Sequence, residues 1–115
     1  MNKIYSFLGL AAKAGRVISG DESSERAIRA GKVQLVIVAC DASLNTRKKF
    51  SNMCTYRSID LRIFGDKDNL GKFVGKDKRT VVCILDKGFS AQLVKLIDGF
   101  EFESGGDHIV ESKNI

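Results

Sequence analysis

Two short runs of apolar, mostly β-branched residues constrain the fold of this 115-residue chain more than any other feature of its sequence. The run over 33–40 reads VQLVIVAC and the run over 80–85 reads TVVCIL, so neither alternates regularly between apolar and polar positions. A strand that is apolar at nearly every position is buried on both faces of its sheet. The two runs therefore predict a central sheet that is covered by helices on both sides.

Helical periodicity before, between and after these runs supplies the covering helices. The first helix is predicted by an apolar i, i+3, i+4, i+7 spacing, formed by Ile4, Phe7, Leu8 and Ala11. Comparable patterns predict further helices over 20–31, 44–55, 65–75 and 89–97, and short strands over 16–19 and 61–63. Because helix and strand alternate, we expect a three-layer α/β/α sandwich with a central mixed sheet of about four strands.

The charge of the chain is positive and unevenly distributed. The net charge is +5, but residues 99–115 hold four acidic residues and one lysine, so the first 98 residues carry 18 basic against 10 acidic residues. A body of this charge attracts phosphates, although charge alone does not identify the partner. We expect a domain over 1–98, and an acidic, partly flexible tail over 99–115 in which the helical period ends at Gly99.

Catalytic and metal-binding residues are hard to assemble from this sequence. The single histidine, His108, lies in the tail, and no cysteine–histidine or serine–histidine pairing is suggested elsewhere. Cys40, Cys54 and Cys83 lie far apart without a C-x-x-C pair, which predicts buried thiols rather than disulfides or a zinc site. We therefore expect no enzymatic activity, no metal and no cofactor.

The chain is expected to be cytoplasmic. Its first 15 residues contain a short apolar stretch that Lys13 interrupts, which predicts a helix rather than a signal peptide. No apolar run approaches the roughly 20 residues of a membrane span. We therefore expect no association with a membrane.

The polar turn 19–23, which reads SGDES and opens the second predicted helix, is the first candidate site. Its side chains and backbone N–H groups lie at a helix start, with Arg26 one turn along, and such an edge can hold phosphates and hydrogen-bond bases. In the structural alternative, Ser19 and Glu22 form a capping box and Arg26 pairs with Glu22. The residues alone leave both interpretations open.

The loop just before the second apolar run is the second candidate site. It gathers Lys76, Lys78 and Arg79 on a surface turn, and Lys67 and Lys72 precede it on the short helix. A local basic patch of this kind suits phosphate contact, whereas a solubilising run of charges is the alternative. Here too the residues alone favour neither interpretation.

Three stretches of the chain, in this order, resemble a known family: GDESSERAIRAGKVQLVIVACDAS, DNLGKFVGKDKR and TVVCILD. They resemble the ribosomal-protein family that binds kink-turn RNA and contains the archaeal and eukaryotic large-subunit proteins of the seven-Ae and thirty-e types. The resemblance runs from about residue 4 to residue 98. The stretches DASLNTRKKF and DKGFSAQLVKLID are similar to the short bacterial YlxQ-type members. The resemblance implies an RNA-binding domain without enzymatic activity.

In that family, a Gly-x-Asn-Glu-x-x-Lys segment at the start of the second helix enters the widened groove beside the sheared G·A pairs. Its positions fall here on Gly20, Glu22, Ser23 and Arg26. The glycine and the cation match, while the Asn and the Glu do not. An ionised Glu22 cannot replace an Asn amide that donates to guanine O6 or N7, although it could accept from an amino group.

The family's loop before its last strand is apolar and packs against bulged nucleotides, whereas here it matches 76–79, which is basic and shorter. We expect this loop to contact phosphates. The segment that lines the family's bulge pocket matches Ala42 and Ser43, and Lys67 matches a family lysine before a Leu-Gly pair. The expected RNA-binding residues are therefore Gly20, Asp21, Glu22, Ser23, Arg26, Ala42, Ser43, Lys67, Lys76, Lys78 and Arg79.

Together these features predict a monomeric ribosomal or ribosome-associated protein that binds structured RNA. The RNA is expected to be a kink-turn or a related element of ribosomal RNA. The alternative is a non-catalytic protein-interaction adaptor of the same fold, since a fold can be kept when its ligand is lost. The sequence leaves open which RNA is bound, and whether the protein is a component of the ribosome or an assembly factor.

Overall fold

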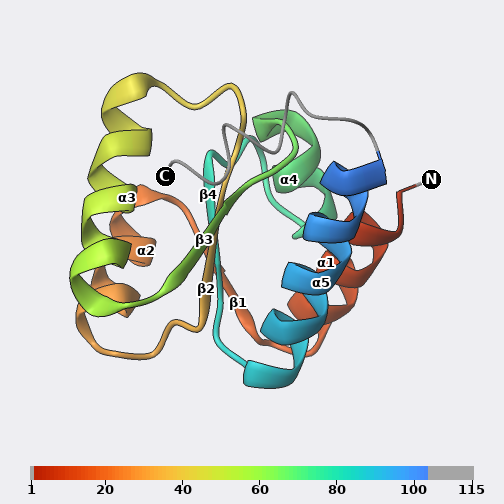
Figure 1. Cartoon of the computed structure of the whole chain (residues 1–115), viewed down its shortest axis with the longest axis horizontal. Coiled ribbons are helices and arrows are strands. Elements are labelled where there is room, and N and C mark those ends of the chain that lie inside the picture. The colour runs from red at the N-terminus through yellow and green to blue at the C-terminus, as the bar shows by residue number, and fades with distance from the viewer. Residues whose placement is uncertain (1, 104–115) are drawn as a thin grey trace.

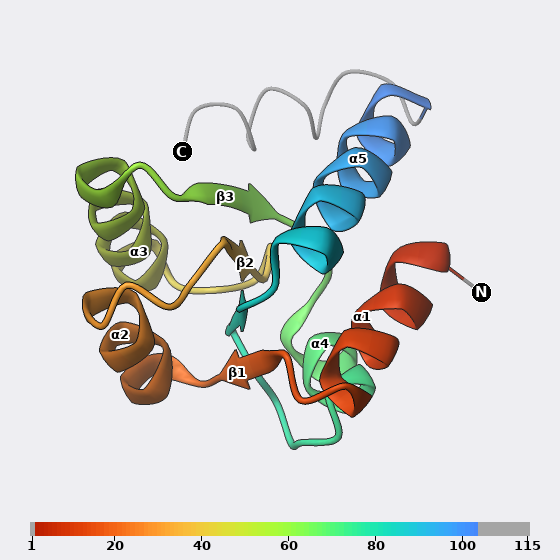
Figure 2. The same ribbon diagram turned by 90° about the horizontal axis from the view of Figure 1, so that it is seen from below.

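A four-stranded sheet lies between two layers of helices in the computed structural model, which describes residues 2–103 (Figure 1). The strands are β1 (Val17–Ser19), β2 (Leu35–Val38), β3 (Asp60–Ile63) and β4 (Val81–Ile84). One face is covered by α2 (Asp21–Arg29) and α3 (Leu44–Arg57), and the other by α1 (Lys3–Lys13), α4 (Lys67–Phe73) and α5 (Lys87–Glu103). Figure 2 shows these layers on opposite sides of the sheet. The predicted three-layer architecture is confirmed.

The sheet is mixed, as predicted, with the strand order β1-β4-β2-β3. Strand β4 is antiparallel to both of its neighbours, β1 and β2, and β3 is parallel to β2. Strands β1, β2 and β3 therefore all finish at the end of the sheet where β4 starts. The chain segments that follow the first three strands and precede the fourth meet at this end.

Successive residues of the two central strands contribute to two separate cores. In β2, Val36 and Val38 pack toward α2 and α3, whereas Leu35 and Ile37 pack toward α1, α4 and α5. Strand β4 divides its residues in the same way because strand side chains alternate between the faces of a sheet. All eight residues of these two strands are 0% exposed. The burial inferred from composition is therefore confirmed for the strand residues of both apolar runs.

Helix α5 extends further than its sequence predicted. The helical period was expected to end at Gly99, but the helix continues to Glu103, so that expectation was wrong. The ring of Phe100 meets the ring of Phe64 edge-on, with 6.0 Å between the centroids, which gives the added turn a packing contact. No helix within residues 2–103 is both long enough and apolar enough to cross a membrane. The rest of the expected tail, 104–115, lies outside the described residues.

Two of the three cysteines are buried, as predicted. Burial raises the pKa of the Cys54 thiol to about 12 and that of Cys83 to about 11, so neither forms a thiolate readily. Cys40 is exposed, contrary to the prediction, because β2 ends at Val38 and the chain has already turned to the surface. Within residues 2–103, no three metal-ligating side chains cluster in a way that could hold an ion.

Replacing Phe50 with Ala tests the core beneath α3. The Phe50 side chain is fully buried, so Phe50→Ala should lower the free energy of unfolding in urea by about 3–5 kcal/mol. The exposed Asn52 of the same helix provides a control, and Asn52→Ala should change the stability by about 0.5 kcal/mol or less. Equal stabilities for the two variants would contradict this account of the core.

Candidate nucleic-acid interface

Helix α2 begins at the end of the sheet without a side-chain cap. Gly20 precedes the helix with φ of +96°, a conformation that favours glycine, and its N–H donates to the Val81 carbonyl at 3.0 Å. Among residues 2–103, no side-chain hydrogen bond caps the start of α2. The predicted capping box is therefore wrong, because Ser19 is the last residue of β1 and its hydroxyl accepts a hydrogen bond from Arg79 Nε at 3.1 Å.

The ion pairs along α2 leave Arg26 available. Glu22 and Arg26 are both exposed, and they form no ion pair with each other, or with any other residue of the described 2–103. Glu25 instead pairs with Arg29 at 3.0 Å and with Lys49 of α3. The hydrogen bond from Lys49 is the main reason why the pKa of the Glu25 carboxyl is lowered. The predicted pair between Glu22 and Arg26 is therefore also wrong.

The basic loop before β4 is fixed to α4 rather than free in solvent. The Lys76 N–H donates to the Gly71 carbonyl at 2.8 Å, and the Arg79 N–H donates to the Lys67 carbonyl at 2.9 Å. A Cβ added at Gly71 would lie 1.7 Å from the Asp77 carbonyl oxygen, so only glycine permits this approach. The loop thus has a defined position on the surface of the protein.

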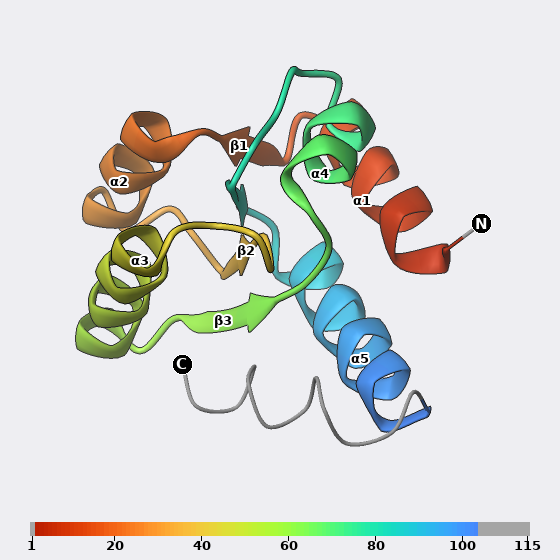
Figure 3. The same cartoon turned by 90° about the horizontal axis from the view of Figure 1, so that it is seen from above.

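Two side-chain hydrogen bonds join this loop to the start of α2. Arg79 Nε donates to Ser19 Oγ at 3.1 Å, and Thr80 Oγ1 donates to Asp21 Oδ1 at 3.2 Å. Figure 3 shows the connection between α4 and β4 passing beside β1, whose end leads into α2. The two candidate sites that the sequence placed some 55 residues apart therefore form one surface.

A surface hollow of about 540 Å³ lies between the two candidate segments. Ser19 and Ser23 line it from one side, and Lys76 and Arg79 line it from the other. A second hollow of about 300 Å³ is lined by Ser23 and Arg26 and continues along α2. Hydroxyl and cationic groups thus surround a space that is open to solvent.

The segment after β2 joins the same surface. Asp41 Oδ1 accepts a hydrogen bond from the Lys67 N–H at 3.0 Å, which ties the segment to the start of α4. Ser43 caps α3 by accepting from the Thr46 N–H at 3.1 Å. Ala42 is buried in the core beneath α3, so of the two predicted residues only Ser43 reaches the surface.

Four residues that hold this surface together were absent from the predicted set: Ser19, Asp41, Gly71 and Thr80. Ser19 was considered only as part of a capping box. Asp41 directly follows the first apolar run and Thr80 opens the second, just before β4, so their polar side chains were a usable signal. Gly71 gave no such signal, because its role depends on the approach of a loop six residues further along the chain.

Segments 20–26 and 66–79 together have no net charge. Segment 20–26 carries three carboxylates and one cation, while segment 66–79 carries five cations and three carboxylates. Lys78 Nζ lies 3.9 Å from Asp68 Oδ1, and both side chains are more than two-thirds exposed, so this ion pair is weak. Position and hydrogen-bonding groups therefore distinguish this surface more than its charge does.

Sequence profiles and curated relatives place this α/β protein in a family. The profile of the ribosomal protein L7Ae/L30e/S12e/Gadd45 family matches residues 2–94. The RNA-binding protein YlxQ of Bacillus subtilis (strain 168) is 36% identical over 94 residues, which cover 82% of this chain and 94% of that protein. The RNA-binding protein YlxQ of Enterococcus faecium is 34% identical over 97 residues, covering 84% and 93% respectively.

The chain belongs to the ribosomal protein L7Ae/L30e/S12e/Gadd45 family. The resemblance to its bacterial YlxQ-type members is confirmed by the two YlxQ relatives. Family membership also confirms the prediction that the chain is not an enzyme.

Solved structures agree with this assignment. A protein of unknown function from Bacillus halodurans superimposes with a TM-score of 0.82 at 39% identity, over 85% of this chain and 99% of that one. The Giardia lamblia 15.5kD RNA binding protein superimposes with a TM-score of 0.71 over 84% of this chain and 83% of that one. At 18% identity, the second match shows a shared fold only.

Replacing Gly71 with Ala tests the contact between the basic loop and α4. The added methyl group would collide with the Asp77 carbonyl, so Gly71→Ala should lower the free energy of unfolding by about 1–3 kcal/mol. Gly99 in α5 has open space around its Cα, so Gly99→Ala should be neutral or stabilising by up to about 1 kcal/mol. Thermal or urea unfolding measures both, and a Gly71→Ala protein of wild-type stability would contradict the proposed contact.

Proposed function

We propose that the chain binds structured RNA at the end of the sheet where α2 begins. The observation that carries this proposal is the hydrogen-bonded joining of three distant segments, which follow β1, follow β2 and precede β4. The first and third of these segments line open hollows whose walls include hydroxyl and cationic groups. A surface of this kind offers both donors for phosphates and groups that can reach base edges.

The uncapped start of α2 is the proposed contact for the RNA backbone. Its first N–H groups lack a side-chain acceptor, and the positive end of the helix dipole favours an anion there. Gly20 keeps the approach free of a side chain. The Asp21 carboxylate accepts a hydrogen bond from the Thr80 hydroxyl and so helps to position the adjoining backbone. Arg26, exposed one turn further along, is the proposed base-reading residue because guanidinium can donate twice to guanine.

Glu22 and Ser23 replace the amide and the carboxylate of the kink-turn motif that this segment resembles. An ionised Glu22 accepts hydrogen bonds, so it suits an exposed amino group rather than the O6 and N7 acceptors of guanine. Ser23, which lines both hollows, can donate as well as accept. We propose that the RNA is a kink-turn or a related element whose base at the Glu22 position presents an amino group.

The remaining proposed contacts come from the segments around this edge. Ser43 and the backbone of Ala42 adjoin Lys67, and the basic loop supplies phosphate contacts through Lys76, Lys78 and Arg79. Arg79 also positions the loop through Ser19, so its removal would alter the site as well as its charge.

The family and its relatives support a role at the ribosome. The family is described as one of ribosomal proteins, and the Bacillus subtilis and Enterococcus faecium relatives are named RNA-binding proteins. We therefore propose a monomeric ribosomal or ribosome-associated protein of the cytoplasm that binds ribosomal RNA. In this proposal residues 1–98 form the RNA-binding domain, and the acidic segment 99–115 follows it, with its first residues completing α5.

Binding of a kink-turn RNA and of an unkinked duplex of equal length tests the proposal. The wild type should prefer the kinked RNA, and Arg26→Ala should reduce that preference by about 1–3 kcal/mol because a bidentate base contact is removed. The control is Arg29→Ala, which removes the same charge three residues further from the helix start. Equal decreases in affinity for both RNAs would make Arg26 a phosphate contact, and no binding to either RNA would favour a protein-interaction adaptor.

The salt dependence of binding tests the basic loop. The double variant Lys76→Ala with Lys78→Ala should weaken the binding of every RNA to the same extent, because phosphate contacts carry no sequence information. The slope of log affinity against log salt should flatten by about 0.7–0.9 for each lysine that neutralises a phosphate in the wild type. The matched control, Lys87→Ala with Lys95→Ala, removes two exposed cations of α5 that lie outside the proposed site. A loop variant with the wild-type slope would show that the loop contacts no phosphate.

A further inference from the structure

Helix α3 carries a concentration of positive charge that the proposed RNA site does not use. Its 14 residues contain four cations and no carboxylate, whereas the edge formed by 20–26 and 66–79 has no net charge. Half of the net charge of +8 that residues 1–98 carry is therefore on this helix, in the layer formed by α2 and α3. The four cations are Arg47, Lys48, Lys49 and Arg57.

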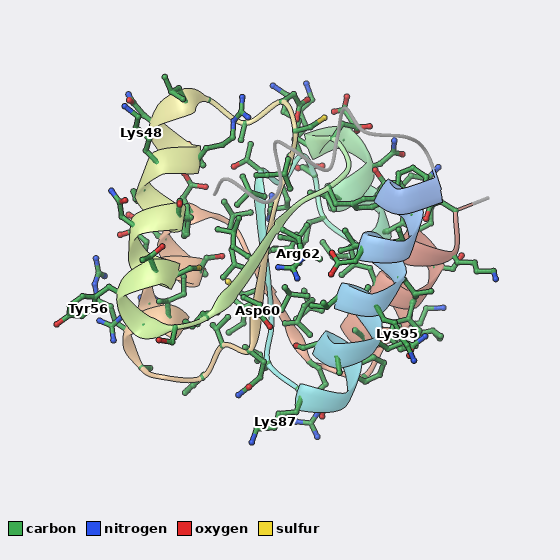
Figure 4. All side chains as sticks on the ribbon, in the orientation of Figure 1. Lys48, Tyr56, Asp60, Arg62, Lys87 and Lys95 are labelled. Atoms are coloured by element: carbon green, nitrogen blue, oxygen red, sulfur yellow. The ribbon has the colours of Figure 1, made fainter. Side chains whose placement is uncertain are left out.

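Two of these cations are exposed and unpaired. Lys49 pairs with Glu25, but Lys48 and Arg57 form no ion pair with any residue of 2–103. The Arg57 guanidinium lies 5.7 Å from the centre of the Tyr56 ring, and Tyr56 is 85% exposed. Figure 4 shows Lys48 and Tyr56 on the outer side of α3, pointing away from the sheet. The helix thus presents a cation, an aromatic ring and a second cation to solvent.

The position of α3 connects this surface to the proposed RNA site. The helix starts after Ser43, which belongs to the edge, and its 14 residues extend about 20 Å away from it. Lys48, Asn52 and Tyr56 follow one another at four-residue steps, and all three are exposed. A strand that leaves the edge can therefore pass along the outer side of α3.

We propose that α3 binds an unpaired RNA segment that flanks the structured element held at the edge. Lys48 and Arg57 contact its phosphates, and Tyr56 stacks on one of its bases. Proteins bind single strands without reading their sequence through aromatic side chains that stack on bases and cations that contact the phosphates. With four cations and no carboxylate, this helix attracts a polyanion, so α3 suits RNA better than a protein partner of mixed charge. This proposal rests on the proposed function, which supplies the structured RNA element that the unpaired segment flanks.

Three RNAs test this proposal in equilibrium binding titrations: a blunt kink-turn RNA, the same RNA with an unpaired tail of about ten uridines, and the tail alone. The variants are Tyr56→Ala, Tyr56→Phe and the double variant Lys48→Ala with Arg57→Ala. The control is again Lys87→Ala with Lys95→Ala, which changes the net charge by the same amount on the opposite helix layer (Figure 4). All four positions of the double variants are exposed, so each protein should keep its fold.

The tail should tighten binding of the wild type relative to the blunt RNA. Tyr56→Ala should reduce that gain by about fivefold or more, as expected for one stacked base, while Tyr56→Phe should keep it. The double variant of α3 should abolish the gain and flatten the salt dependence of binding to the tailed RNA by about 0.7 for each phosphate that the wild type neutralises. The control variant should keep the gain in affinity from the tail, and Tyr56→Ala should leave the affinity for blunt RNA unchanged.

A tail that adds no affinity to the wild type would overturn the proposal, as would equal decreases in affinity for the α3 variant and its control. Failure of the proposed function gives a different result. In that case the wild type would not bind the blunt RNA, while binding of the tail alone at low salt would still depend on Tyr56. If the variants of Tyr56, Lys48 and Arg57 bind the tail alone as tightly as the wild type does, the inference about α3 is overturned.

Discussion

The antiparallel pairing of β2 with β4 is the interaction on which the rest of the structure depends. Every side chain of the two strands is buried, and each strand sends alternate residues into both cores. Backbone N–H and C=O groups in such a place must be paired, because no water reaches them. A shift of one residue would also exchange the residues of the two cores. The register that pairs Val38 with Val81 is therefore strongly determined.

This register also determines where the proposed RNA site lies. Just beyond the pair, the Ala39 N–H donates to the Thr80 carbonyl at 2.9 Å, so the segments after β2 and before β4 leave the sheet together. The start of α2 comes from one helix layer and the basic loop is attached to α4 in the other. Arg79 and Thr80 can join the two segments because β2 ends and β4 begins between the two helix layers. The site is thus a consequence of the sheet order and of the buried pairing at its centre.

The sequence predicted the elements well because each has a local cause, namely an apolar run for a strand or a 3.6-residue period for a helix. It failed where a distant contact decides the outcome. The spacing of Ser19 and Glu22 fits a capping box, but Arg79 engages the Ser19 hydroxyl. Gly99 predicted a helix end because glycine costs a helix about 1 kcal/mol, yet Phe100 packs against Phe64. The approach permitted by Gly71 is likewise visible only in three dimensions.

A neutral edge and a cationic helix also separate two contributions to RNA binding. Electrostatic interactions between exposed charges decay over a Debye length of about 8 Å at physiological salt. The far end of α3 is about 20 Å from its start at the edge. The charge of Arg57 therefore adds little to the affinity of an RNA confined to the edge, whereas Lys48 lies only about 6 Å along the helix and acts on both. Arg57 and Tyr56 contact only RNA that runs along α3, so recognition at the edge and binding at the far end of the helix can vary independently.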